Sequence, residues 1–134
     1  MNDGKKILIA DDDDDFRGII ATKLKNLGFQ TAEAKNGKEA IVAAEEDMPD
    51  LIVLDVSMPE MDGMEAFFNM QKNPKLKKIK KAFLTNYGDP YKEASWIDEK
   101  FAREAGALDY IKKTDNLNEI VSQIKKLLRI PFAD

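Results

Sequence analysis

The chain has 134 residues, of which 43% are hydrophobic and 34% are charged, a composition that predicts one soluble globular domain. It contains no cysteine and no histidine, which excludes disulfides, thiolate or imidazole metal sites, and serine–histidine–aspartate catalysis. Any bound metal ion must therefore be held by oxygen, which favours Mg²⁺, Ca²⁺ or Mn²⁺. The net charge of −4 gives no support to nucleic-acid binding. The first apolar stretch, residues 7–10, is too short to span a membrane, so we expect a cytoplasmic protein without membrane insertion.

Five short apolar runs alternate along the chain with five segments of helical periodicity. The continuous apolar runs are typical of strands that are buried on both faces of a sheet. Gly28 and Gly106 are helix stop signals, and Asn36 and Asn116 are suitable helix caps. The expected strands cover residues 6–10, 29–34, 51–54, 82–84 and 108–111, and the expected helices cover residues 16–27, 37–47, 64–72, 94–105 and 117–127.

Strict alternation of strand and helix predicts a parallel sheet that is covered by helices on both faces and connected right-handedly. No linker, low-complexity segment or internal repeat divides the chain. We therefore expect a single α/β domain over residues 1–134, with its core at about 5–129 and no further domain attached.

Polar residues stand at the ends of several expected strands, where open α/β sheets bind their ligands. Asp11 and Asp12 follow the first strand, and Asp55 follows the third. Thr85 follows the fourth strand, and Lys113 lies just beyond the fifth. If the first and third strands are neighbours, the three carboxylates converge. Each pair then repels by roughly 4 kcal/mol at about 4 Å in an effective dielectric near 20. Such a cluster must take up protons, pair with Lys113 or bind a divalent cation, for which Mg²⁺ is the best fit.

These side chains are suited to phosphoryl transfer. The cation would bridge carboxylate and phosphoryl oxygens, while Lys113 and the hydroxyl of Thr85 would contact the remaining phosphoryl oxygens. Asp55 is then left as the nucleophile that forms an aspartyl phosphate.

Four segments, in this order along the chain, resemble the receiver domain of two-component response regulators. The resemblance extends from Lys5 to about Leu128 and implies a flavodoxin-like, doubly wound (βα)5 sandwich of three layers, with a five-stranded parallel sheet in the order 2-1-3-4-5. It also implies a stand-alone signalling module that catalyses only its own phosphorylation and dephosphorylation. The matching segments are ILIADD at 7–12, DLIVLDVSMPEMDG at 50–63, FLT at 83–85 and GALDYIKK at 106–113.

The same resemblance assigns roles at the acidic site. Asp55 corresponds to the phosphoacceptor, which takes its phosphoryl group from a sensor histidine kinase or a histidine phosphotransfer protein. Asp11, Asp12 and Asp55 correspond to ligands of Mg²⁺, which Mn²⁺ can replace. The backbone carbonyl of Ser57 corresponds to a further ligand, and Lys113 and Thr85 correspond to the groups that contact the phosphoryl oxygens.

Thr85 and Tyr110 resemble the coupled switch pair of the family, in which the hydroxyl moves towards the phosphoryl group and the aromatic ring turns inward. The face formed by the helix over 94–105, the strand over 108–111 and the last helix then changes. The resemblance therefore implies a downstream protein target at this face, and no nucleic-acid partner.

Some positions depart from the family's pattern. Thr114 stands where a proline commonly follows the lysine, and residues 86–104 are longer than expected. The resemblance implies that Ser57, Asn86 and Tyr87 occupy positions at which the family tunes how fast water removes the phosphoryl group. We expect the bulky Tyr87 to shield the acyl phosphate and to lengthen its lifetime.

Competing interpretations are weaker. An EF-hand loop fails because Phe16 stands where that loop needs glycine. A Mg²⁺-dependent aspartyl-phosphate phosphatase would need a second acid at Ser57, and an FMN binder would need a phosphate loop in place of the acidic one. A phosphorylation-independent pseudo-receiver scaffold remains an alternative. The basic stretch at 72–81 is expected to be a solvated loop and not a site for an anionic partner.

Overall fold

The computed structural model describes residues 4–85, 107–113 and 116–129. The described strands form one parallel sheet in the order β2-β1-β3-β4-β5, which confirms the predicted topology. None of the helices in this part of the chain has the length and apolar composition that crossing a bilayer requires. The strands are β1 (Lys6–Ala10), β2 (Gln30–Ala34), β3 (Leu51–Asp55), β4 (Lys80–Thr85) and β5 (Ala107–Lys112), and the helices are α1 (Asp14–Asn26), α2 (Gly37–Asp47), α3 (Gly63–Gln71) and α6 (Leu117–Arg129). The helix expected over 94–105 lies outside the described residues.

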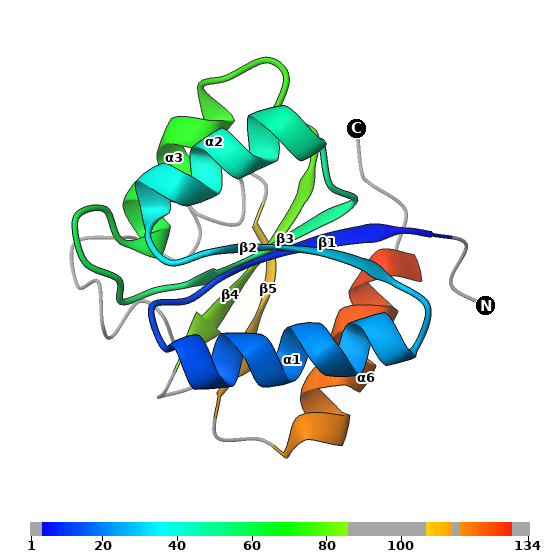
Figure 1. The fold of residues 1–134 in the computed structure, drawn as a ribbon. Coiled ribbons are helices and arrows are strands. Elements are labelled where there is room, and N and C mark those ends of the chain that lie inside the picture. The colour runs from blue at the N-terminus through cyan, green and yellow to red at the C-terminus, as the bar shows by residue number, and fades with distance from the viewer. Residues whose placement is uncertain (1–3, 86–106, 114–115, 130–134) are drawn as a thin grey trace.

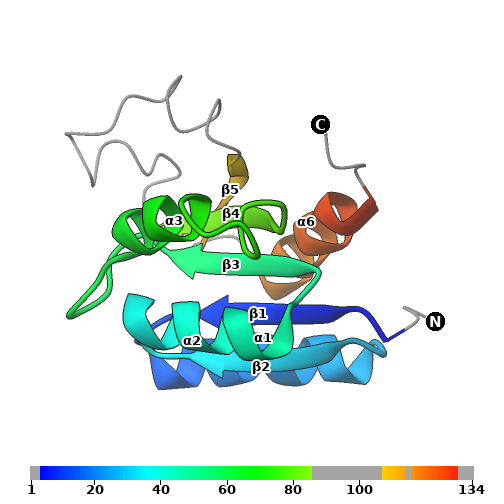
Figure 2. The same ribbon diagram turned by 90° about the horizontal axis from the view of Figure 1, so that it is seen from above.

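The sheet is the middle one of three layers (Figure 1), and its strands lie side by side in the view from above (Figure 2). Ile7 and Ile9 of β1 pack in the apolar cluster between the sheet and helices α1 and α6. Leu8 and Ala10 of the same strand pack in the opposite cluster, with α2 and α3. Because side chains alternate across a strand and both faces are covered, a central strand needs apolar residues at every position. This explains the continuous apolar runs of β1 and β3.

Side-chain caps set the beginning of the described helices. In each case the cap oxygen accepts the backbone N–H three residues further on, at 2.8 to 3.1 Å. The predicted caps Asn36 and Asn116 are confirmed. Helix α1 begins at Asp14, ahead of the apolar repeat that starts at Phe16, and Asp13 caps it by accepting the N–H of Phe16. The caps are Asp13, Asn36, Asp62 and Asn116.

Lys81 is fully buried near the start of β4, so the expectation of a solvated loop over 72–81 is wrong at this residue. Its ammonium donates to the carbonyl oxygens of Leu76 and Ile79, both at 2.7 Å. Burial lowers the pKa of Lys81 to about 8, and the ammonium therefore remains mostly charged at neutral pH. The buried cation satisfies carbonyl groups of the segment between α3 and β4, and it ties this segment to the sheet.

We expect Lys81→Met to lower the free energy of unfolding by about 1–3 kcal/mol, because it leaves buried carbonyl groups without their donor. Lys78→Met is the matched control, since Lys78 is exposed, and it should change stability by no more than about 0.5 kcal/mol. Urea denaturation at pH 7 measures both variants. Equal stability of the two would show that the buried ammonium contributes nothing.

Candidate functional site

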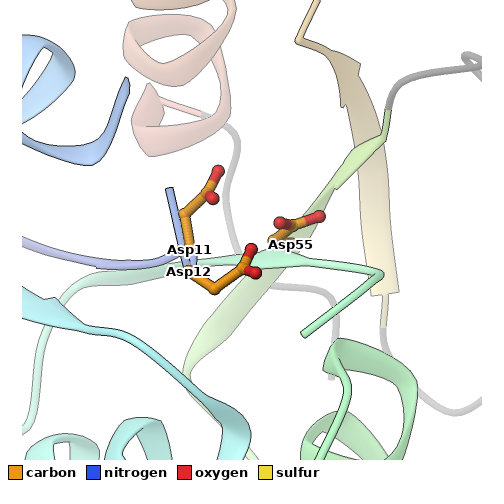
Figure 3. A group of neighbouring side chains, drawn as sticks. All are labelled: Asp11, Asp12 and Asp55. Atoms are coloured by element: carbon orange, nitrogen blue, oxygen red, sulfur yellow. The ribbon is translucent and has the colours of Figure 1, made fainter. Parts of the chain in front are cut away.

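Three carboxylates lie together at the carboxyl ends of β1 and β3 (Figure 3). One carboxylate oxygen from each of Asp11, Asp12 and Asp55 lies within 4.8 Å of the others. Strands β1 and β3 are paired neighbours, so the residues at their ends meet at the same edge of the sheet. Asp11 and Asp55 are buried, whereas Asp12 is exposed. The structure therefore brings these residues together, as the sequence predicted.

Lys113 places a positive charge between two of these carboxylates. Its Nζ lies 2.9 Å from Oδ2 of Asp11 and 3.5 Å from Oδ2 of Asp55. The backbone N–H of Lys113 donates to the carbonyl oxygen of Thr85 at 2.9 Å, which anchors the residue to the end of β4. Burial alone would lower the pKa of Lys113, but Asp11 and Asp55 outweigh this effect and raise the pKa. The lysine is therefore a cation that is fixed inside the site.

The ring of Phe16 lies against the ammonium of Lys113. The Nζ of Lys113 lies 4.8 Å from the centroid of the Phe16 ring, within the range of a cation–π contact. Nothing in the sequence indicates this role, because a phenylalanine at a helical repeat position is usually a packing residue.

Asp55 is held in its protonated form more strongly than an ordinary carboxyl group. Burial raises the pKa of Asp55 to about 8, and the negative charge of Asp11 acts in the same direction. Lys113 and the backbone N–H of Ser57, which donates to Oδ1 of Asp55 at 3.2 Å, oppose this shift without cancelling it. A protonated carboxyl group is a poor nucleophile and a poor metal ligand. Further positive charge is therefore needed before Asp55 can act as either near neutral pH.

Gly63 allows α3 to begin directly against the backbone of Asp55. A Cβ atom at Gly63 would clash with the carbonyl oxygen of Asp55 and lie 2.8 Å from its carbonyl carbon. The N–H of Gly63 donates to the carbonyl oxygen of Val56 at 3.1 Å. The signal that could have revealed this contact is a glycine at the first position of a helix, where a better helix former would be expected. Close approach of α3 thus fixes the main chain on which Asp55 is carried.

The donor set fits a magnesium ion. The three carboxylates offer hard oxygen ligands, which Mg²⁺ prefers. Oδ2 of Asp11 is buried, and apart from its ion pair with Lys113 it receives no hydrogen bond from the described part of the chain. When all three acids are ionised, their negative charges exceed the single positive charge of Lys113. A divalent cation would neutralise the remainder.

The structure gives the positions of some of the other predicted site residues, and their roles stay predictions. Thr85 is buried at the end of β4, next to the strand that carries Asp55. Tyr110 lies in β5, in register with Phe83 of β4, and the inward turn of its ring stays a prediction. Ser57 is exposed beside the site, and the role of its carbonyl is a prediction too. Asn86, Tyr87 and Thr114 lie outside the described residues.

Comparisons with known proteins agree with this fold. The sequence matches the model of the response regulator receiver domain family over residues 7–125. It is 34% identical over 125 residues to the probable transcriptional regulator ycf27 of Cyanophora paradoxa, covering 93% of this chain and 48% of the relative. It is 32% identical over 125 residues to the alkaline phosphatase synthesis transcriptional regulatory protein PhoP of Bacillus subtilis, covering 93% of this chain and 49% of the relative.

Solved structures show the same similarity. A putative response regulator from Chloroflexus aurantiacus superposes with a TM-score of 0.79 at 28% sequence identity, over 94% of this chain and 98% of that chain. The chain therefore belongs to the response regulator receiver domain family, whose members serve two-component signal transduction. It spans about half the length of the curated relatives it matches.

We expect Asp55→Asn to gain stability relative to the wild type as the pH rises from 5 to 8 in EDTA. The pKa of Asp55 is about 8 in the folded chain, against 3.8 for an ordinary carboxyl group. The stability that comes from its protonated form is therefore present below pH 4 and is lost as the pH rises through 8. One unit of pKa difference corresponds to about 1.4 kcal/mol, so the relative gain should exceed about 1 kcal/mol.

Urea denaturation of both proteins at pH 5 and pH 8 measures this difference. Asp15→Asn, at an exposed acid of α1, is the control and should follow the wild type at both pH values. A difference between Asp55→Asn and wild type that does not change with pH would contradict the raised pKa.

Proposed function

We propose that this domain accepts a phosphoryl group from a phosphohistidine onto Asp55, in a Mg²⁺-dependent reaction, and thereby changes a protein-binding face. The observation that carries this proposal is the buried Asp55 carboxyl, which lies with Asp11, Asp12 and Lys113 at one edge of the sheet. Membership of the receiver domain family supports the same chemistry. The donor would be a sensor histidine kinase or a histidine phosphotransfer protein.

Asp55 would supply the nucleophile. One carboxylate oxygen forms the new P–O bond while the P–N bond to the donor imidazole breaks, and the imidazole nitrogen keeps the bonding electron pair. Lys113 would leave part of its contact with the carboxylates and pair with a phosphoryl oxygen, because its Nζ lies 3.5 Å from Oδ2 of Asp55. The Thr85 hydroxyl would donate a hydrogen bond to another phosphoryl oxygen.

Asp11, Asp12 and Asp55 would hold the metal ion, together with the backbone carbonyl of Ser57. When bound, Mg²⁺ supplies positive charge to carboxylate and phosphoryl oxygens in a site that otherwise repels anions. Mn²⁺ could replace it, because both ions accept hard oxygen ligands. The raised pKa of Asp55 supports this requirement, since the chain's own cation does not suffice to keep that carboxyl ionised at neutral pH.

The signal would leave the site through β4 and β5. Thr85 is linked to the strand end of β5 by the hydrogen bond from the N–H of Lys113 to its carbonyl oxygen. A shift of Thr85 towards a phosphoryl group would therefore act on β5, which carries Tyr110. We propose that a downstream protein binds the face formed by residues 94–105, β5 and α6. In keeping with the family's role, we also propose a cytoplasmic location.

Single-domain organisation without an output domain stays a prediction, as does the absence of a nucleic-acid partner. The curated relatives are named transcriptional regulators, and the chain spans about half of their length.

The lifetime of the aspartyl phosphate is proposed to depend on Ser57, Asn86 and Tyr87. We expect Tyr87→Ala to shorten the half-life of the phosphorylated protein, because a smaller side chain would give water access to the acyl phosphate. Intact mass followed over time after removal of the donor measures the decay. A half-life in the variant that equals or exceeds that of the wild type would contradict this role.

Incubation with acetyl phosphate and Mg²⁺, followed by intact mass, tests the proposed function. We expect one added phosphoryl group on the wild type, lost on treatment with hydroxylamine and absent from Asp55→Asn or in EDTA. Asp15→Asn, an exposed acid of α1, should be phosphorylated like the wild type. An unmodified wild type, with small donors and with histidine kinases alike, would favour the pseudo-receiver scaffold. Repeated turnover of a small phosphate ester would instead favour a phosphatase.

A further inference from the structure

Arg17, in the first turns of α1, joins three elements that meet at the acidic site. Its Nη1 donates to the backbone carbonyl oxygen of Asp11 at 2.7 Å. Its Nε donates to Glu33 of β2 at 3.0 Å, and its Nη2 donates to Asp14 at 2.7 Å. The Arg17 side chain is only 15% exposed. The guanidinium is thus a largely enclosed cation, and its N–H groups donate to these three partners.

The partners of Arg17 hold its guanidinium in one orientation. The group is planar and its donors form a rigid fork, so contacts from two sides define its plane. Glu33 contacts it from β2 and Asp14 from the start of α1. Burial would lower the pKa of Arg17, but these two carboxylates raise it overall. The donor that faces Asp11 is therefore fixed in both position and charge.

Each polar group of Asp11 has a close partner. The N–H of Asp11 donates to the carbonyl oxygen of Ala34 at 3.0 Å. Its Oδ1 accepts the N–H of Asp13 at 2.9 Å, and its Oδ2 pairs with Lys113 at 2.9 Å. The remaining group, the carbonyl oxygen, accepts from Arg17.

The contact from Arg17 has a particular consequence for the neighbouring residue. The carbonyl of Asp11 belongs to the peptide unit that joins Asp11 to Asp12, and a peptide unit is planar. Fixing this carbonyl therefore fixes the direction in which the chain continues to Asp12. Asp12 is exposed and has no comparable side-chain contact in the described part of the chain. Its position within 4.8 Å of the other acids then depends on the main chain that carries it.

We propose that Arg17 is a positioning residue for the metal site: it orients the Asp11–Asp12 peptide so that both carboxylates converge with Asp55. This inference rests on the proposed Mg²⁺-dependent function and deepens it. Arg17 touches neither the ion nor the phosphoryl group. It acts through the main chain of two ligand residues.

Electrostatics alone predicts the opposite effect for the loss of this side chain. A positive charge near the carboxylates repels a divalent cation, so its removal should strengthen Mg²⁺ binding. Loss of a positioning contact should weaken Mg²⁺ binding, and loss of such supporting contacts commonly weakens metal binding by about 10–100-fold. The direction of the change in affinity therefore separates the two accounts.

Isothermal titration calorimetry of the full chain with MgCl₂ at pH 8 tests the proposal. We expect Arg17→Gln to raise the Kd for Mg²⁺ by about tenfold or more. Arg17→Lys keeps the charge but lacks the fork, so it should raise the Kd by a smaller factor, about threefold. Arg129→Gln, on the exposed side of α6, is the matched charge control and should bind like the wild type. Urea denaturation in EDTA records the stability of each variant without the ion.

An unchanged or lower Kd in both Arg17 variants would overturn the proposal, even if they lose stability in EDTA, because Arg17 would then be only structural. If Arg17→Gln does not fold, the charge-matched Arg17→Lys decides alone. Absence of Mg²⁺ uptake by the wild type would remove the proposed function together with this inference. Uptake by the wild type, with unaltered variants, would remove this inference alone.

Discussion

Repulsion among three carboxylates at the ends of two adjacent strands is the constraint on which the site depends. Lys113 offsets part of it by its contacts with Asp11 and Asp55. Burial, together with the remaining negative charge of Asp11, raises the pKa of Asp55 to about 8. A site with this residual charge would favour a small divalent cation, and the same cation would release Asp55 for reaction. Affinity for the metal and reactivity of the nucleophile thus have one physical origin.

The strand order of the fold brings the carboxylates together, and local contacts then hold them in place. Pairing of β1 with β3 sets Asp11 and Asp55 at the same edge of the sheet. Gly63 lets α3 approach the main chain of Asp55, and α1 contributes Phe16 beneath Lys113 and Arg17 against the Asp11 carbonyl. The two helices lie on opposite faces of the sheet (Figure 1), so the acids are supported from both sides.

Periodicity was sufficient to predict a parallel sheet covered by helices and the acids at its strand ends, whereas the strand order that brings those acids together came from the resemblance to the receiver family. Alternating apolar runs and the caps Asn36 and Asn116 depend on neighbours in sequence, and these features were correct. The roles of Lys81 and Arg17 depend on tertiary partners instead. Lys81 resembles the solvated lysines around it until the carbonyl groups that accept its hydrogen bonds are in place. Arg17, on α1, needs Glu33, which lies on strand β2.

The titration of Asp55 itself tests the central claim most directly. The ¹³Cγ resonance of Asp55, assigned by its absence in Asp55→Asn, can be followed from pH 4 to pH 9 in EDTA and then in saturating Mg²⁺. Without the metal, the account predicts a titration midpoint near 8. With the metal, the midpoint should fall by about 1–3 pH units, because a nearby cation favours the carboxylate. A midpoint near the ordinary value of 3.8 in EDTA, or one that Mg²⁺ leaves unchanged, would contradict it.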